Sequence, residues 1–444
     1  MGTLSKSIAI IGLVLFLSYT FLMNPSYQLP LFPAKPQEKF PVIKASPTNI
    51  SHIVFGTVGS VNTWKHKRSY IESWWQPNVT KGYIFMDSAP GNEYLPWPST
   101  SPPFRVSEDI TKLKGYPNYS NKIQLRIVQT VLEVFREGDE NVRWYVMTDD
   151  DTVLVIDNLV DMLAKYDHTK YLYIGTNSEC THNNFAFSFD MAYGGAGYAL
   201  SYPLMEALSK TLEMCIERYP HLYTSDNVLG ACVADLGVDR THEQGFHQID
   251  LHGDISGLLS AHPNTPFLSL HHIDTIDPIF PSKNRSESIN QLLQAAKFDH
   301  SRILQQTICY NKPISWTFSV SWGYSVHIYE NVLPRSFLKK PLETFTPWWS
   351  GSGKEPPFFM FNTRWPSFTG NPCVDPHSFF ADSNQNIDGN QILTTFSRRS
   401  SRGLLACAAS GNHSAEPITK IMVISPIPKT VEVSILYHRI IVFT

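Results

Sequence analysis

The sequence predicts an α/β fold with a mostly parallel sheet, followed by a β-rich extension and preceded by one apolar helix. Three observations support this prediction. Short apolar runs alternate with helical patterns up to about residue 282, strand-prone segments rich in Pro, Ser and aromatic residues follow, and an unbroken apolar run lies near the N-terminus. Alternating strands and helices favour a parallel sheet, because each crossover helix covers one of its faces. With 444 residues, of which 42% are apolar, the chain can bury a large core.

The N-terminal segment predicts a membrane anchor. Residues 7–23, SIAIIGLVLFLSYTFLM, are almost wholly apolar and follow Lys6. At ~1.5 Å rise per residue, such a helix just spans a thin bilayer. No small-residue cleavage site follows, which favours an uncleaved anchor over a signal peptide. We therefore expect a cytoplasmic tail over residues 1–6, a transmembrane helix over 7–23, a Pro- and Lys-rich stem over 24–47, and a luminal body.

Sequons and cysteines are consistent with a luminal body. Five N-x-S/T sequons have no Pro at the middle position: Asn49, Asn78, Asn118, Asn284 and Asn412. The cysteine count is six, and an even number permits disulfides in an oxidising compartment. Buried free thiols are the alternative for Cys215 and Cys232, which lie in apolar helical patterns.

Residues 48–282 carry the alternating elements. Buried-strand patterns occur at SHIVFGTVGS (51–60), GYIFMD (82–87), RWYVMT (143–148) and YLYIGT (171–176). Apolar residues at helical spacing predict helices at KRSYIESWW (67–75), LRIVQTVLEVF (125–135) and PLMEALSKTLEMCI (203–216), and a further helix after Asp157. These segments define the predicted first domain.

Residues 283–444 predict a β-rich extension packed on the first domain. Pro, Ser, Asn and aromatic residues dominate, and WTFSVSWGYSVHIYE (316–330) is strongly β-prone. The tail VEVSILYHRIIVFT (431–444) is β-branched and predicts a final strand. Its charged residues argue against a second membrane span.

Three consecutive acids, Asp149, Asp150 and Asp151, stand at the end of a predicted strand. They repel one another, and a turn needs only one Asp. Taken alone, the triplet is most simply explained as a solvated turn. However, ligands in α/β sheets bind at the carboxyl ends of strands, and a D-x-D arrangement can aim two carboxylates at Mg²⁺ or Mn²⁺. Such an ion would neutralise a diphosphate and remove the repulsion.

Composition and further segments narrow the chemistry. The net charge is −3 and no Lys/Arg block occurs, which disfavours nucleic acid as a partner. Asp226, at the start of a helical pattern, is either an N-cap or a general base. Gly194, Gly195 and Gly197 would allow close approach of the backbone to a ligand, and the alternative is a tight turn. His247, His271 and His272 are candidate metal ligands, and the alternative is that they are packed or surface histidines.

In this order, the segments IVFGTVGS, KRSYIESWW, RWYVMTDDDTVLV, YIGT, MAYGGAGYALS and SDNVLGACVADLGV resemble the Fringe-like branch of glycosyltransferase family 31. GFHQIDLHGDISGLLSAHPNTPFLSLHHID and WTFSVSWGYSV are especially similar to plant members of unassigned function. The resemblance covers about residues 50–282 and continues more loosely to about residue 375. It implies a GT-A nucleotide-sugar transferase fold, a UDP-sugar donor, Mn²⁺ (or Mg²⁺), and inversion to a β-1,3 linkage on a glycan or glycoprotein. Together with the predicted anchor, we expect a single-pass type II protein of the Golgi membrane, with the endoplasmic reticulum as the alternative.

The resemblance also implies roles for individual residues. Asp149 to Asp151 match the D-x-D motif, with Asp151 as the direct metal ligand and Asp149 and Asp150 nearer the donor and bound water. His247 matches a metal-binding His, and Asp226 matches the base. The implied donor-binding residues are Asp150, Arg68, Asp87, Gly194, Gly195 and Gly197.

One departure keeps a second hypothesis open. Many relatives have an acidic pair where this chain has Ser-Asp-Asn, so that Asn227 replaces one acid. Counting back from Gly230 aligns Asp226 with the single Asp of the commoner Glu-Asp-Val form. The alternative function is a non-catalytic carbohydrate-binding protein on the same fold. A glycosidase that uses Asp150 and Asp226 is disfavoured, because three adjacent acids suit a metal better than a proton-sharing pair.

Overall fold

The structure is a computed structural model that describes residues 46–349, 357–365, 370–411, 413–427 and 439–443. The predicted tail, membrane helix and nearly all of the predicted stem lie outside the described residues, as does the sequon at Asn412. In the described part, no helix combines the length and apolar character that a membrane crossing needs. Residues Thr48–Thr444 belong to one compact unit.

The first sheet is mixed and has seven strands among the described residues, in the order β3-β2-β1-β4-β7-β6-β8. Their bounds are β1 Ile53–Gly59, β2 Lys81–Met86, β3 Phe104–Val106, β4 Trp144–Asp149, β6 Tyr173–Gly175, β7 Tyr198–Ser201 and β8 Arg240–His242. All neighbouring pairs are parallel except those made by β7, which runs antiparallel to β4 and β6. The predicted parallel strands are therefore confirmed, whereas β7 forms from a glycine-rich segment for which we predicted no strand.

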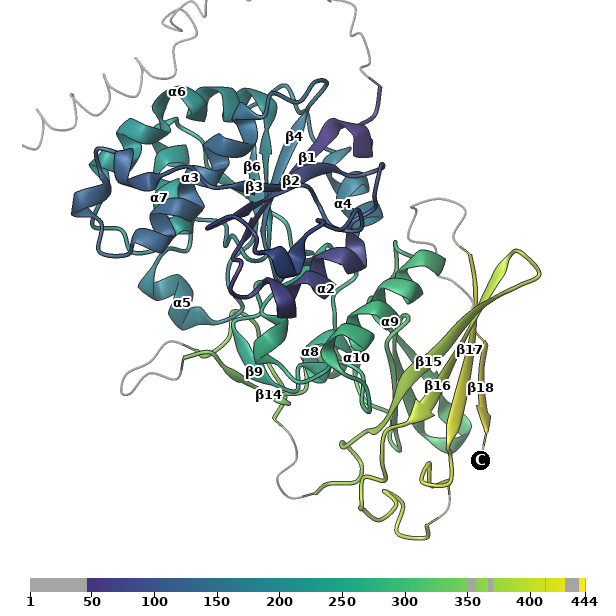
Figure 1. The fold of residues 1–444 in the computed structure, drawn as a ribbon. Coiled ribbons are helices and arrows are strands. Elements are labelled where there is room, and N and C mark those ends of the chain that lie inside the picture. Colours follow the sequence, from purple (N-terminus) through teal and green to yellow (C-terminus); the bar gives the residue numbers. More distant parts are fainter. Residues whose placement is uncertain (1–45, 350–356, 366–369, 412, 428–438, 444) are drawn as a thin grey trace, which may run out of the picture. The chain divides into compact units, whose positions relative to one another are not determined.

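Helices cover both faces of this sheet (Figure 1). On one face lie α3 (Lys122–Arg136), α6 (Tyr202–Arg218) and α7 (Ser225–Asp235), and on the other lie α2 (Trp64–Trp74) and α4 (Ile156–Leu163). Strand residues alternate between the two cores. Tyr145 and Met147 pack with α3, α6 and α7, whereas Trp144 and Val146 belong to the opposite core. Burial on both faces explains why the strands are continuous apolar runs.

Two short ladders lie at the edge where the β4 strand ends. β5 (Val153–Leu154) pairs antiparallel with β10 (Ser269–Leu270), and β9 (Leu251–Gly253) pairs antiparallel with β14 (Phe345–Pro347). The short helices α5 (Thr181–Ala186) and α8 (Ser256–Leu259) lie in the connecting segments. These ladders bring distant parts of the sequence beside the acidic triplet.

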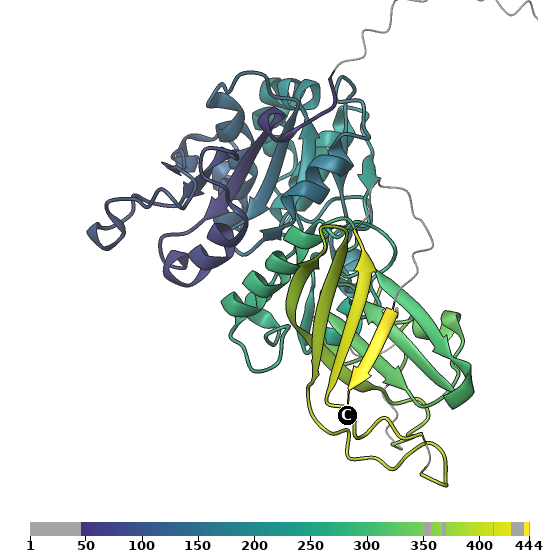
Figure 2. The same ribbon diagram turned by 90° about the vertical axis from the view of Figure 1, so that its right-hand side faces the viewer.

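The C-terminal region forms a second, antiparallel sheet of seven strands in the described part of the chain (Figure 2). The strands are β11 Gln306–Asn311, β12 Trp316–Ser321, β13 Ser325–Tyr329, β15 His377–Ile387, β16 Gln391–Arg398, β17 Lys420–Pro426 and β18 Arg439–Phe443. The helices α9 (Arg285–Phe298) and α10 (Arg335–Leu338) accompany it. Both the β-rich character of this region and a strand within the tail are confirmed. The domain boundary after residue 282 stays a prediction.

Disulfides settle the alternative left open for the cysteines. Cys215 of α6 is bonded to Cys232 of α7, with Cα atoms 5.7 Å apart, and Cys373 is bonded to Cys407. Cys180 and Cys309 are free thiols. The first bond ties together two of the three helices on one face of the first sheet, and one of these, α7, carries Asp226 in its first turn.

Candidate functional site

The ends of three neighbouring strands create the site. β1 lies between β2 and β4 and runs parallel to both, with Val58 opposite Asp149. Parallel strands end at the same edge, so the residues after β1, β2 and β4 meet there. Asp149 is the last residue of β4, and a turn closed by the Thr152 N–H on the Asp149 carbonyl carries the other two acids.

Two acids of the triplet are buried, which a solvated turn does not explain. Asp150 is 5% exposed and Asp151 is 6% exposed. The ammonium of Lys67, on α2, lies 2.9 Å from Asp150 Oδ1 and 3.2 Å from Asp151 Oδ2. Thr63 Oγ1 donates to the second oxygen of Asp150 at 3.2 Å. The protein thus supplies its own positive charge to two buried carboxylates.

A histidine completes the cluster on its other side. His271 Nε2 lies 3.1 Å from Asp151 Oδ1 and 3.6 Å from Asp149 Oδ2. One ligand atom from each of Asp149, Asp151 and His271 lies within 4.8 Å of the others. Two carboxylate oxygens and one imidazole nitrogen are a donor set that Mn²⁺ accepts, and Mg²⁺ accepts the oxygens. The residues present therefore fit a divalent cation.

The close charges shift the pKa of each group. Burial, with Asp151 and Asp226 nearby, raises the pKa of Asp149 to about 7, against the opposing pull of His271. Burial also acts to raise the pKa of Asp151, but His271 and Lys67 outweigh it and hold that pKa well below its usual range. Burial acts to lower the pKa of His271, yet the carboxylates raise it to about 9. Because imidazole binds metals in its neutral form, metal binding here would release the His271 proton.

Asp226 lies in the first turn of α7 but does not cap it. The N-cap is Thr224, whose hydroxyl accepts the Asn227 N–H at 3.3 Å. The structural explanation offered for Asp226 is therefore wrong. Burial raises the pKa of Asp226 to about 6, although a hydrogen bond from the Gly194 backbone opposes the shift. Asn227 donates its side-chain amide to the Phe187 carbonyl at 2.9 Å, a structural contact.

The glycine run lies against both Asp226 and the metal cluster. A Cβ on Gly194 would lie 2.6 Å from Asp226 Oδ1, and a Cβ on Gly195 would lie 2.0 Å from His271 Cε1. Gly197 has a φ of +87°, which favours glycine. We predicted close approach of this backbone to a ligand. In the structure the backbone closely approaches the side chains that form the site.

The structure places His247 apart from the acids. Its Nδ1 lies 2.9 Å from Glu179 Oε1, and its Nε2 lies 3.0 Å from His262 Nε2. The physical reason is the β5–β10 pairing, which holds Leu270 opposite Val153 and so brings the next residue, His271, to the acidic turn. Of the three histidines predicted as candidates, the structure thus brings His271 into the cluster in place of His247.

Arg68 and Asp87, both predicted to bind the donor, differ from each other in their position relative to the acids. Arg68 lies one residue beyond Lys67 and pairs with Glu72 at 2.9 Å, with its side chain 41% exposed. Asp87 follows β2 and accepts hydrogen bonds from Ser60 Oγ at 2.7 Å and the Val61 N–H at 3.0 Å. Asp87 is thus at the predicted strand-end edge, whereas Arg68 points to Glu72 rather than to the acids.

Sequence reasoning missed several residues of the site. Lys67 is adjacent to Arg68 in the predicted helix, and helical spacing does not indicate which of the two faces the acids. Arg126 donates to the carbonyls of Gly59 and Phe85, at the ends of β1 and β2, from a helix for which we considered only the apolar face. Tyr193 has a buried hydroxyl with no hydrogen-bond partner among the described residues, near Asp226 and Asp250. No sequence pattern marked it.

A stack of rings supports His271 from behind. The His271 and His272 rings are 3.9 Å apart, and Trp348 lies 4.5 Å from His272 at an interplanar angle of 15°. Trp348 also stacks on His252 at 4.7 Å. Trp348 directly follows β14, whose pairing with β9 sets its position. A residue of the predicted extension therefore buttresses the cluster.

The family model described as Fringe-like matches residues 54–256, a range that includes the acidic triplet and Asp226. A second model, described as "Protein of unknown function, DUF604", matches residues 183–437, more than half of the chain. The chain belongs to this DUF604 family, and the resemblance expected from the sequence is confirmed.

Individual relatives match over shorter ranges. A mouse protein named beta-1,3-glucosyltransferase is 32% identical over 119 residues, which are 27% of this chain and 23% of that protein. The human protein of the same name is 30% identical over the same shares. The chain thus spans less than a quarter of the length of these curated relatives. Among solved structures, mouse xyloside xylosyltransferase 1 in its apo form aligns with a TM-score of 0.29 at 10% identity, over 46% of this chain and 86% of that one.

Proposed function

We propose that this protein is a glycosyltransferase with a GT-A fold that moves a sugar from a UDP-sugar to a hydroxyl of a glycan or glycoprotein. One observation carries the proposal, namely the convergence of two kinds of group beside one glycine run. Gly195 packs on His271 of the metal-compatible cluster, and Gly194 packs on Asp226, a carboxyl with a pKa raised by burial. A metal-compatible cluster beside a lone poised carboxylate suits metal-assisted group transfer.

The cluster of Asp149, Asp151 and His271 would hold Mn²⁺ or Mg²⁺. When bound there, the ion would neutralise the donor diphosphate and act as a Lewis acid on the leaving group. The chain prepares this role by holding the ligand atoms in place. Lys67 anchors Asp151 from one side, and the ring stack anchors His271 from the other. Asp150 would act indirectly, because its two oxygens already bind Lys67 and Thr63.

Asp226 would act as the general base. In this step an acceptor hydroxyl transfers its proton to the Asp226 carboxylate while its oxygen forms a bond to the anomeric carbon. The bond from that carbon to the diphosphate oxygen breaks, and UDP leaves with the electron pair. A single displacement of this kind inverts the anomeric configuration. The names of the two curated relatives support a β-1,3 linkage.

The proposed setting is the Golgi membrane, with a type II orientation and the catalytic region in the lumen. The apolar run at residues 7–23 supports an anchor. The sequon residues Asn49, Asn78, Asn118 and Asn284 are all exposed, as glycan attachment requires. Two disulfides suit an oxidising compartment.

The test is UDP release by the full-length protein with a panel of UDP-sugars, acceptor glycans and Mn²⁺. We expect release with at least one donor, and its loss in Asp226→Asn and Asp151→Asn variants that still fold. Wild-type release that never exceeds that of Asp226→Asn, across the whole panel, would overturn the proposal.

The ion pairs of Lys67 favour a second candidate, a non-catalytic carbohydrate-binding protein. They neutralise Asp150 and Asp151 without any metal. Titration of UDP with and without Mn²⁺ separates the two functions. A transferase binds UDP more tightly with Mn²⁺, and this gain disappears in Asp151→Asn. A protein that binds only glycans shows no such gain.

A further inference from the structure

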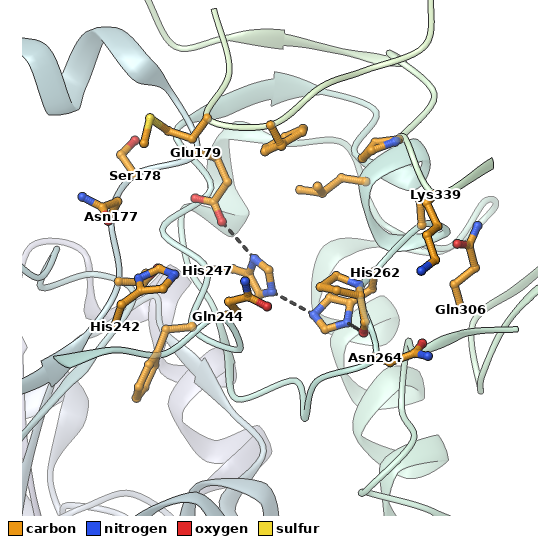
Figure 3. A pocket seen from close by; sticks show the side chains of 18 of the residues that line it. Asn177, Ser178, Glu179, His242, Gln244, His247, His262, Asn264, Gln306 and Lys339 are labelled. Atoms are coloured by element: carbon orange, nitrogen blue, oxygen red, sulfur yellow. Dashed lines mark hydrogen bonds and ion pairs between the residues drawn. The ribbon is translucent and has the colours of Figure 1, made fainter. Parts of the chain in front are cut away.

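A cavity of about 720 Å³ lies apart from the acidic cluster (Figure 3). It is lined by the segments that follow β6 and β8, by the turn near His262, and by β11 and α10. None of Asp149, Asp151, His271 and Asp226 is among its lining residues. Its volume is in the range usual for small-ligand pockets, roughly 300–1,000 Å³. Part of its wall comes from the C-terminal region that only the DUF604 match covers.

A continuous chain of hydrogen bonds, from the Pro263 carbonyl through His262 and His247 to Glu179, lies in the wall of this cavity. His262 Nδ1 lies 2.9 Å from the Pro263 carbonyl, which can only accept, so that Nδ1 carries hydrogen. Burial lowers the pKa of His262 to about 3, so its ring is neutral and its Nε2 accepts from His247 at 3.0 Å. His247 Nδ1 in turn faces Glu179, whose second oxygen accepts the Ile249 N–H at 2.7 Å.

The charge that remains for a ligand is positive. Glu179 is the only acid among the described lining residues, and both its oxygens are engaged within the protein. Arg335 and Lys339 also line the cavity, and they lie four residues apart on α10 and at its end. Both are exposed, and neither forms an ion pair with a carboxylate in the described part of the chain. Figure 3 shows the Lys339 side chain on the side of the cavity that faces His262.

The rest of the lining suits a sugar. Gln244 and Asn264 are exposed and present amide groups, each of which can both donate and accept hydrogen bonds with hydroxyls. Phe361 and Met360, which are half-buried and exposed respectively, add apolar surface against which the C–H face of a pyranose can pack. Apolar walls with a few polar groups are typical of small-ligand sites.

We propose that this cavity binds an acidic saccharide, a sugar with a carboxylate or sulfate group that pairs with Lys339 and Arg335. The hydroxyls would bond to Gln244 and Asn264. The site goes beyond the proposed transferase activity, because binding here requires neither the donor nor a metal. It would let the protein select glycans by a charge remote from the reacting hydroxyl.

The experiment measures binding to the full-length protein by calorimetry, without UDP-sugar and with EDTA present. The probes are trigalacturonate, lactose 3′-sulfate and, as the neutral control, lactose. We expect binding of at least one acidic probe and weaker binding of lactose. Lys339→Ala and Arg335→Ala should each weaken the binding about tenfold, since each removes a charge-assisted hydrogen bond.

Lys340→Ala is the matched control, because Lys340 is the adjacent exposed lysine and does not line the cavity. It should bind like the wild type, and all three variants should melt like the wild type. Equal binding of lactose, no binding of either acidic probe, or an equal loss in Lys340→Ala would each overturn the proposal. Asp226→Asn should keep the binding, so a failure of the transferase proposal is a separate result.

Discussion

At the scale of single residues, the site depends on how positive charge is shared among three adjacent carboxylates. Lys67 forms ion pairs with Asp150 and Asp151, and His271 forms ion pairs with Asp151 and Asp149. The carboxylates raise the pKa of Lys67, against the opposing effect of burial. Because removal of one partner from a buried ion pair leaves an uncompensated charge, Lys67 is the residue on which the folded cluster most depends.

We therefore expect Lys67→Met to lower the free energy of unfolding by about 3 kcal/mol in the presence of EDTA. Mn²⁺ should recover part of this loss, because a cation at the cluster replaces the missing charge. Denaturant titrations with EDTA and with Mn²⁺ measure both effects. The matched control is Arg68→Met on the same helix, whose exposed pair with Glu72 is worth at most about 1 kcal/mol. Equal losses for the two variants would contradict the assigned role of Lys67.

Asp226 gives a prediction of pH dependence. A base must be deprotonated to act, and burial raises the pKa of Asp226 to about 6. Activity should thus rise with pH through about 6 and then level off, with kcat/KM falling about tenfold per pH unit below that value. Asp226→Asn should lower kcat by roughly 10²–10⁴-fold. UDP release between pH 5 and 8 measures both, and a profile flat from pH 5 to 7 would exclude Asp226 as the base.

Sequence patterns could name most of the residue types in the site but not their partners. The acids were found because three adjacent carboxylates are conspicuous at a strand end, and Asp226 because it opens a helical pattern. His271 and His247 were both candidates, and only the β5–β10 pairing decides which lies at the acids. Similarly, Lys67 and Arg68 are neighbours, and the rotation of α2 on the core determines which one faces the acids. Such choices depend on tertiary packing, which periodicity does not contain.

At the scale of elements, the β9–β14 ladder connects the C-terminal region to the site. It places Trp348 between His252 and His272, and His272 stacks on His271. Trp348 is about 80 to 100 positions away in the sequence from the two histidines on which it stacks, so no local sequence pattern could predict this stack. β7 was likewise missed, because its four residues directly follow a glycine run that indicates a turn, and only the pairing with β4 and β6 marks them as a strand.

We expect Trp348→Ala to lower the affinity of the cluster for Mn²⁺. The substitution removes the ring that limits motion of His272 and, through it, of His271. Loss of support for a ligand typically costs about 10-fold to 100-fold in metal affinity. Trp349→Ala is the control, since Trp349 is 54% exposed and its ring contacts His182. Mn²⁺ titrations that give the same affinity for both variants would show that the ring stack does not support the cluster.

At the scale of the whole molecule, the region of the first sheet and the C-terminal region share side-chain hydrogen bonds and one core. Ser69 Oγ on α2 lies 2.7 Å from Ser286 Oγ on α9, and Ser260 Oγ lies 2.7 Å from Ser325 Oγ on β13. One continuous core joins strands of both regions, from Phe55 in β1 to Phe379 in β15. The Fringe-like match ends at residue 256, before the segment that supplies His271.

These contacts predict that the regions unfold together. A chain that ends at residue 282 would keep the acids, Asp226 and His271 but lose α9, β14 and Trp348. It would expose the apolar surface of α2 and β9 that these elements cover, so we expect it to aggregate or unfold. The intact protein should show one cooperative thermal transition by both circular dichroism and tryptophan fluorescence. If the shortened chain instead stays monomeric and melts within a few degrees of the intact protein, residues 48–282 are a self-sufficient domain, and the C-terminal sheet is an attachment rather than a part of the site's support.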